Sequence, residues 1–186
     1  MTLTRQLPSL RRSLPDPLVP DLWPEATIAT TTDIVVSGIS LVRLVEVYGT
    51  PCSHRGAAVL PGTGGRPSPT ATTTVTVARV NAIAVHSSGR FLVQTDARLD
   101  DPRLIWSEIR LINRASTAHT GEVLLDRHPD GGDRNVGDRE GSEREGTDAP
   151  VAVDLPLDLR VGDLLVLPSR PQGTPVVLAT WLSDLE

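Results

Sequence analysis

Hydrophobic and polar positions alternate along much of the chain, and a period of two is typical of β-strands. The longest such run, residues 70–85, is rich in Thr and Val, and a second run at residues 90–97 returns after a turn at residues 87–89. Because β-branched residues favour extended backbone and a short Gly-containing turn joins neighbouring strands, we predict a hairpin here.

Shorter apolar runs bounded by turn residues predict further strands. Residues 103–116 fit either a strand or a helix, and the alternation around Ile109 and Leu111 favours the strand. Residues 161–163 predict a turn between two runs. The other strand candidates are residues 33–40, 121–126, 151–156, 159–168 and 174–182.

One segment changes to the helical period, near residues 40–48. Ser40 is a suitable N-cap, and Gly49 followed by Pro51 is a stop signal. The apolar face of this predicted helix consists of Leu41, Leu44, Val45 and Tyr48.

Proline, glycine and charge mark the segments between these elements. Residues 1–26 contain five prolines and predict an extended lead-in, with Trp23 as its anchor. The Gly- and Pro-rich residues 53–69 predict a connector without an element of real length. Residues 127–150 are mostly charged residues and Gly, so we expect a flexible solvated loop; a site for a cationic partner is the alternative.

Several short strands, one helix and no βαβ alternation indicate a mainly β fold, a barrel or a sandwich, as a single domain over residues 27–186. Hydrophobic residues make up 39% of the chain and aromatic residues only 3%, so the core consists of aliphatic side chains. The net charge of -5 and the scattered arginines argue against nucleic-acid binding. No apolar run reaches the length of a signal peptide or a membrane span, so we expect a cytoplasmic protein.

Few residues are candidates for catalysis. His119 and Glu122 are close in sequence and could share a proton, although such pairs are more often ordinary surface neighbours. Cys52 could be a thiolate nucleophile activated by His54, but a structural role is favoured because no orienting group adjoins it. The four histidines and one cysteine lack the spacing of a metal site.

Four pieces of the sequence, in order, resemble diaminopimelate decarboxylases and their fold-type III pyridoxal-phosphate relatives. The first, residues 22–52, ends in "LVRLVEVYGTPC", which is similar to the helix that precedes the cofactor barrel of that family; Tyr48, Gly49, Thr50 and Pro51 match it. The others are residues 65–103, 118–126 and 155–175, the last with "RVGDLL" around Gly162 and Asp163.

The resemblance implies that the cofactor barrel, which would follow Cys52, is missing. What is left looks like the second domain of the family, a Greek-key β-barrel similar to the C-terminal domain of alanine racemase. In that family this domain completes the active site of a neighbouring subunit, so the resemblance implies an exposed docking face.

The departures from the family concern catalysis. The chain has no Lys, so it cannot form the Schiff base that holds pyridoxal phosphate. Ala118 and His119 occupy the places of the Cys and the acidic residue in the family motif, and Thr120, Gly121 and Glu122 follow in place of Ser, Gly and Asp. In the stretch that supplies a Tyr near the cofactor, Gly173 is present and the Tyr is not.

We therefore expect a subunit that is non-catalytic on its own and associates with itself as a homodimer or with a decarboxylase partner that carries the pyridoxal-phosphate barrel. The chain alone is expected to bind no cofactor and no metal. Two alternatives stay open: a small divergent enzyme that uses His119 with Glu122, or Cys52, and a module that binds a ligand or protein at the barrel end or the charged loop.

Overall fold

The structure is a computed structural model that describes residues 2–127 and 149–173. It is mainly β, as the alternating pattern predicts. The strands are β1 (Thr27–Ala29), β2 (Ile34–Val36), β3 (Ile39–Ser40), β4 (Cys52–Val59), β5 (Pro67–Val85), β6 (Phe91–Thr95), β7 (Arg110–Ile112), β8 (Thr120–Leu125), β9 (Val151–Pro156) and β10 (Leu164–Pro168). The helical elements are α1 (Leu3–Gln6), η1 (Pro8–Arg12), η2 (Pro20–Leu22), α2 (Leu41–Tyr48) and η3 (Trp106–Glu108).

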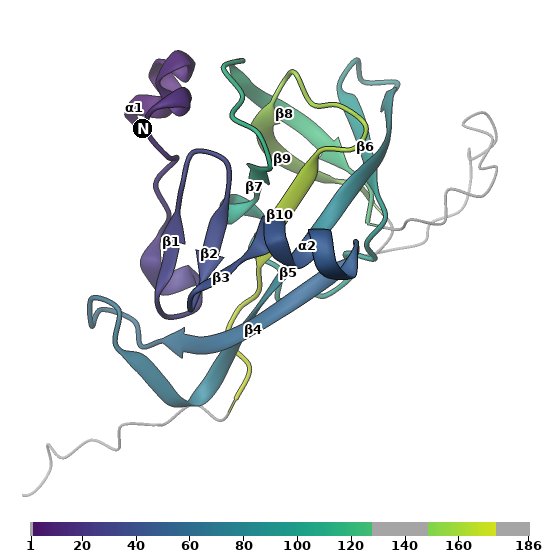
Figure 1. Cartoon of the computed structure of the whole chain (residues 1–186). Helices are drawn as coiled ribbons and strands as arrows, with labels where there is room; N and C mark the ends of the chain where they lie inside the picture. The colour runs from purple at the N-terminus through teal and green to yellow at the C-terminus, as the bar shows by residue number, and fades with distance from the viewer. Residues whose placement is uncertain (1, 128–148, 174–186) are drawn as a thin grey trace, which may run out of the picture.

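Seven strands form one strongly curved sheet in the order β7-β10-β5-β6-β8-β9, with β4 also paired to β5 (Figure 1). Within it β6 and β8 are parallel and the other pairs are antiparallel. The sheet curls so that its outer strands β7 and β9 approach each other, which makes a nearly closed barrel with one open seam.

The predicted hairpin is confirmed as β5 and β6. The amide of His86 donates to the carbonyl of Arg90 over 2.8 Å, and Gly89 adopts a φ of 79°, which suits a glycine in a tight turn. β5 is 19 residues long, and its two parts pair with different strands. Its first part pairs with β4 and β10, and its last part pairs with β6.

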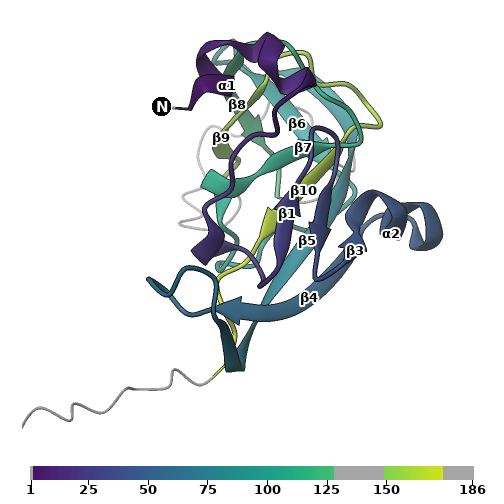
Figure 2. The same cartoon turned by 60° about the vertical axis from the view of Figure 1, so that its left-hand side comes forward.

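Two hydrophobic cores share the strand β10. Leu165 and Leu167 point into the barrel, whereas Leu164 and Val166 point to a second core on its outer face. That second core is covered by the three-stranded sheet β1-β2-β3 and by α2 (Figure 2). Because both faces of β10 are buried, every residue of this strand is apolar, as its sequence "LLVLP" requires.

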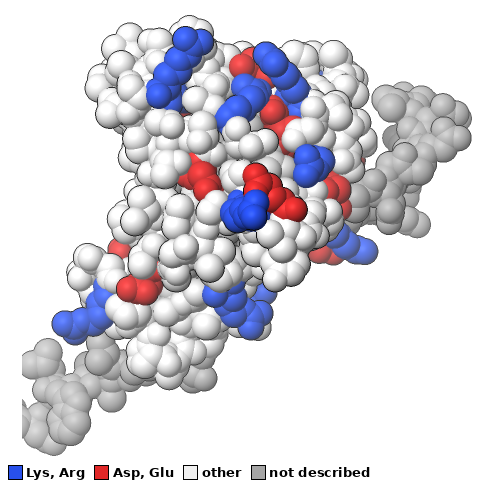
Figure 3. All heavy atoms as spheres, in the orientation of Figure 1, with Lys and Arg blue, Asp and Glu red and all other residues white. Residues whose placement is uncertain are grey.

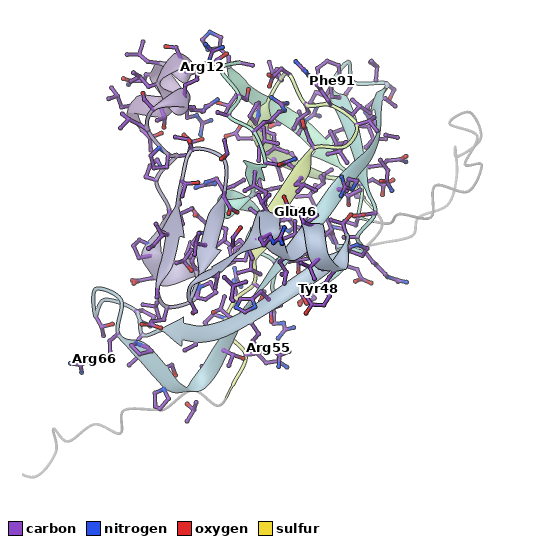
Figure 4. The ribbon with its side chains drawn as sticks, viewed as in Figure 1. Arg12, Glu46, Tyr48, Arg55, Arg66 and Phe91 are labelled. Atoms are coloured by element: carbon purple, nitrogen blue, oxygen red, sulfur yellow. The ribbon has the colours of Figure 1, made fainter. Side chains whose placement is uncertain are left out.

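The predicted helix is confirmed as α2. Ser40 Oγ accepts a hydrogen bond of 3.0 Å from the amide of Arg43, and Gly49 ends the helix with a φ of 76°. The predicted apolar face is correct for Leu41 and Val45, which are buried, but wrong for Tyr48, which is 76% exposed. Tyr48 is the last residue of the helix, and its ring points outward (Figure 4).

Two predictions about the connecting segments are wrong. The lead-in contains helical turns, because Pro8 and Pro20 each begin a 3-10 helix, where the fixed φ of proline is favourable and its missing amide costs nothing. The predicted connector over residues 53–69 contains β4, which gains its backbone hydrogen bonds from β5 despite Gly56 and Ala57. The connector is confined to residues 60–66, where Gly and Pro are concentrated.

The remaining strand predictions vary in outcome. The strands at 121–126, 151–156 and 159–168 are found as β8, β9 and β10, and residues 33–40 form the β2–β3 hairpin. Residues 103–116 contain the short strand β7, but η3 interrupts the predicted run. The predicted strand at 174–182, and the predicted charged loop over 127–150 apart from its ends, lie outside the described residues.

Candidate functional site

A cleft of about 630 Å³ lies at the open seam of the barrel. Its walls are the two outer strands β7 and β9 together with η3 and the start of β8, and the N-terminal segment lies across it. Figure 2 shows this segment passing beside β8 and β9. A cleft of this volume is within the range that small-molecule sites occupy.

Four arginines from two distant stretches of the chain line this cleft: Arg5, Arg11, Arg110 and Arg114. Arg5 pairs with Asp154 of β9 over 2.5 Å, which joins α1 to the edge of the barrel. Arg11 donates from Nη1 to the carbonyl of Ala118 over 2.9 Å. In Figure 3, basic and acidic side chains lie together near the top of the molecule, where the N-terminal segment meets the barrel.

Two of these arginines have a buried donor without a hydrogen bond. Arg11 is only 6% exposed, and its Nε has no hydrogen-bond acceptor, although Asp16 Oδ2 lies 3.2 Å away as an ion-pair partner. Arg110 Nε is also buried without an acceptor. Buried donors of this kind are rare, because each loses its hydrogen bond to water and gains none in return.

Arg114 is held rigidly on one wall of the cleft. It donates from Nε and Nη2 to the two carboxylate oxygens of Asp163 over 2.8 and 2.7 Å, and from Nη1 to Asp158 over 3.1 Å. The hydrogen bonds that Arg114 donates to Asp163 and Asp158 raise its pKa. Burial alone would raise the pKa of Asp158, but hydrogen bonds from Ser116 and Arg114 outweigh it and lower that pKa.

The structure does not join the proposed acid and base His119 and Glu122 by a hydrogen bond or ion pair. Both side chains are exposed, and Glu122 forms an ion pair with Arg90 of the neighbouring strand region. The carbonyl of His119 accepts a hydrogen bond from the amide of Leu157, so its backbone has a structural function. Glu122 and Thr120 line the seam cleft, whereas His119 does not.

Cys52 is partly buried at the start of β4, on the outer side of the barrel. Burial raises the pKa of its thiol, and the negative charge of Asp96 raises that pKa further. His54 is two residues along the same strand, and no hydrogen bond connects it to Cys52 among the described residues. A thiol with a raised pKa is mostly protonated near neutral pH and is a poor nucleophile.

The other residues of the family motifs have structural roles in this fold. Thr50 Oγ1 accepts a hydrogen bond from Arg79, and Pro51 follows it at the entry to β4. A Cβ on Gly121 would lie 2.9 Å from the side chain of Leu157, so this glycine allows close packing. Gly162, with a φ of 95°, forms the predicted turn before β10. A Cβ on Gly173 would lie 2.6 Å from the carbonyl oxygen of Thr70.

The arginines of the seam cleft are the residues that sequence reasoning missed. Arg5 and Arg114 are more than a hundred positions apart along the chain, and none of the four arginines belongs to a motif. Their one signal in the sequence is that all 18 basic residues are Arg, a side chain suited to buried ion pairs and to oxyanion binding.

Among residues 2–127 and 149–173, no helix is both long and apolar enough to span a membrane, and no three metal-ligating side chains are grouped together. A scan against models of known protein families finds no match to this chain, and a search of curated proteins finds none either. The geometry of the seam and of the N-terminal segment is therefore the basis for a functional argument.

Proposed function

We propose that this chain is a non-catalytic β-barrel subunit that acts by docking to a partner protein through its N-terminal segment. The observation that carries the proposal is an inversion of polarity in α1 and η1. Thr4, Pro8 and Arg11 face the barrel and are buried. The residues that face outward are Leu3, Leu7, Leu10 and Leu14, here called the leucine face; Leu3, Leu7 and Leu14 are 56%, 53% and 45% exposed, and Leu10 is half-buried.

This arrangement is unfavourable for the chain alone. A surface helix normally buries its apolar side and exposes its polar side. Covering a leucine side chain completely contributes about 1.5–3 kcal/mol. Four leucines on the outer face of one segment therefore favour a bound state in which another surface covers them.

The leucine face is short and irregular, because Leu7, with a φ of -123° and a ψ of 81°, separates α1 from the 3-10 helix η1, and Leu14 lies beyond η1. An apolar groove in the partner can enclose such a segment better than a flat surface can. Four half-exposed leucines offer much less than the roughly 800 Å² per partner that stable interfaces bury, so a partner that wraps around the segment is favoured over a second copy of this chain.

The charge of the segment indicates which polar groups the rim of the partner's groove should carry. Arg12 is exposed at the end of η1 and projects from the top of the molecule (Figure 4). Among the described residues it has no ion pair, whereas Arg5 and Arg11 are paired with Asp154 and Asp16. We propose a partner whose apolar groove has at least one carboxylate on its rim.

The resemblance to diaminopimelate decarboxylase-like enzymes extends this proposal. It suggests that the nearly closed barrel is a Greek-key domain like the C-terminal domain of alanine racemase, and that the partner carries a pyridoxal-phosphate barrel. The residues of this chain do not fit the cofactor itself, because the sequence contains no Lys for the Schiff base. The cofactor would therefore belong to the partner.

Site-specific photocrosslinking tests the docking face. A photoreactive residue is placed at Leu7, and as a matched control at Val85, which is 70% exposed on the β5–β6 hairpin. A partner crosslinked only at position 7 is identified, purified and mixed with the chain. Leu7→Gln should weaken that complex about tenfold or more, because one buried leucine is lost, and Val85→Gln should not. Arg12→Glu should weaken it further at low salt.

Three results would count against the proposal. The same proteins could crosslink at both positions, Leu7→Gln could leave the affinity unchanged, or the wild-type chain could sediment as a dimer that Leu7→Gln dissociates. The last result would identify a second copy as the occupant of the leucine face. A visible aldimine absorbance in the purified partner would support the relationship to the decarboxylases, and its absence would remove it.

A further inference from the structure

The geometry points to a second function for the chain: the seam cleft binds a small organic oxyanion, a molecule with a carboxylate or phosphate group and a short hydrocarbon part. Three arginines that line the cleft, Arg5, Arg11 and Arg110, would hold the oxyanion. The site is separate from the leucine face, which lies on the outer side of the N-terminal segment.

The donors of the cleft match an anion. Arg110 Nε is buried and has no hydrogen-bond acceptor, and a shift of its side chain toward the cleft would let it donate to a ligand oxygen. Arg11 Nε also has no hydrogen bond, but Asp16 Oδ2 lies 3.2 Å away as its ion-pair partner. Guanidinium groups bind carboxylate and phosphate oxygens with charge-assisted hydrogen bonds, and they stay charged at any physiological pH. An oxyanion in the cleft would therefore supply an acceptor to Arg110 Nε and share Arg11 with Asp16.

The third arginine is available because its own ion pair is weak. The Arg5–Asp154 pair joins side chains that are 46% and 49% exposed, and solvent screens such pairs strongly. A ligand oxygen can replace Asp154 at Arg5 with little loss. Arg114 is different, because Asp163 and Asp158 already accept hydrogen bonds from all three of its nitrogens. It therefore lines the cleft but does not bind the ligand.

Each of the three carboxylates of the lining has an arginine partner, which offsets its negative charge. Glu122 pairs with Arg90, which lies outside the lining, Asp16 with Arg11 and Asp154 with Arg5. The hydroxyl of Thr120 adds a polar group to the lining.

The volume and the apolar part of the lining favour an organic ligand over an inorganic ion. About 630 Å³ is much larger than a single phosphate needs, and Trp106, Ile109 and Leu111 form an apolar portion of the wall. A ligand with a short carbon chain can contact this wall while its oxyanion contacts the arginines.

A charge reversal inside the cleft tests the site without removing any arginine. Ala152 is exposed on β9 and lines the cleft, so Ala152→Glu places a carboxylate among the arginines. Ala84 is exposed on β5 outside the lining, and Ala84→Glu makes the same change in net charge. Succinate and glycerol 3-phosphate are the probes for the carboxylate and phosphate arms, and sodium chloride at equal ionic strength controls for screening.

Thermal unfolding of the full chain is measured against probe concentration and confirmed by calorimetric titration. At least one probe should raise the Tm of the wild type and of Ala84→Glu in a saturable manner, and its affinity should fall at least tenfold in Ala152→Glu. The probe with the higher affinity shows whether the cleft prefers a carboxylate or a phosphate. The inference is overturned if neither probe exceeds sodium chloride, or if Ala152→Glu and Ala84→Glu bind equally well. Leu7→Gln, which removes the docking contact, should leave this binding unchanged, so the two proposals can fail separately.

Discussion

Trp23 Nε1 donates a hydrogen bond of 2.8 Å to Glu108 Oε2, and both side chains are buried, at 0% and 4% exposure. The same carboxylate oxygen accepts from Arg110 Nη2 over 3.2 Å. One buried carboxylate thus joins the N-terminal segment, η3 and β7, and it positions Arg110 on the wall of the cleft. The anchoring role expected for Trp23 is explained by this contact.

Substitutions at this contact should reduce the free energy of unfolding. Trp23→Phe keeps most of the ring but removes the donor, which should cost about 1–3 kcal/mol. Glu108→Ala should cost more, about 3–5 kcal/mol, because it leaves the charge of Arg110 without its buried partner. Urea unfolding measures both, with exposed Glu46→Ala on α2 as a control within about 0.5 kcal/mol of wild type. Equal stabilities for Glu108→Ala and Glu46→Ala would contradict this account.

The N-terminus of α2 has two polar caps, Ser40 and Asp33, whose side chains share a hydrogen bond. Ser40 Oγ accepts from the amide of Arg43, and Asp33 Oδ1 accepts from the amide of Val42 over 3.1 Å. Ser40→Ala should cost about 1 kcal/mol of unfolding free energy. Asp33→Ala should cost at least as much, since Asp33 also accepts from the hydroxyl of Ser40 over 2.5 Å. Because both single variants break the Ser40–Asp33 hydrogen bond, the double variant should lose less than the sum of the two, and full additivity would contradict this coupling.

Acid should destabilise the protein partly through Asp158. Its pKa in the folded state lies below the ordinary value because hydrogen bonds from Ser116 and Arg114 outweigh burial. A lowered folded pKa means that the stabilisation is complete above the unfolded pKa, about 3.9, and is lost as the pH falls through the folded value. From neutral pH to about pH 3, the urea midpoint should therefore fall further for wild type than for Asp158→Asn. Equal acid sensitivity of the two proteins would refute this assignment.

Cys52 should react slowly with thiol reagents. Burial and the charge of Asp96 raise its pKa, so only a small fraction is thiolate near neutral pH. Alkylation by iodoacetamide should be slower than for a free cysteine, and its rate should rise with pH. Asp96→Asn removes the charge but keeps an oxygen that accepts from the amide of Arg79, so it should accelerate alkylation. Fast alkylation of the wild type near neutral pH would contradict this account and support Cys52 as a nucleophile.

The sequence indicates the elements whose residues interact locally. The β5–β6 hairpin and the cap of α2 follow from residues within a few positions of each other, and both predictions are confirmed. β4 was missed because its stability comes from pairing with β5, and a stretch with Gly56 and Ala57 has low β-propensity on its own. The inward direction of Arg11 could not be predicted, because it depends on a barrel seam formed by residues a hundred positions later.

Strand β10 also has a consequence for biosynthesis. It contributes to both hydrophobic cores, yet it is translated after nearly all of the described chain. While the chain is still on the ribosome, neither core can close until residues 164–168 have left the exit tunnel. The apolar sides of β5 and β6 are open until that moment, so the nascent chain should be a substrate for chaperones.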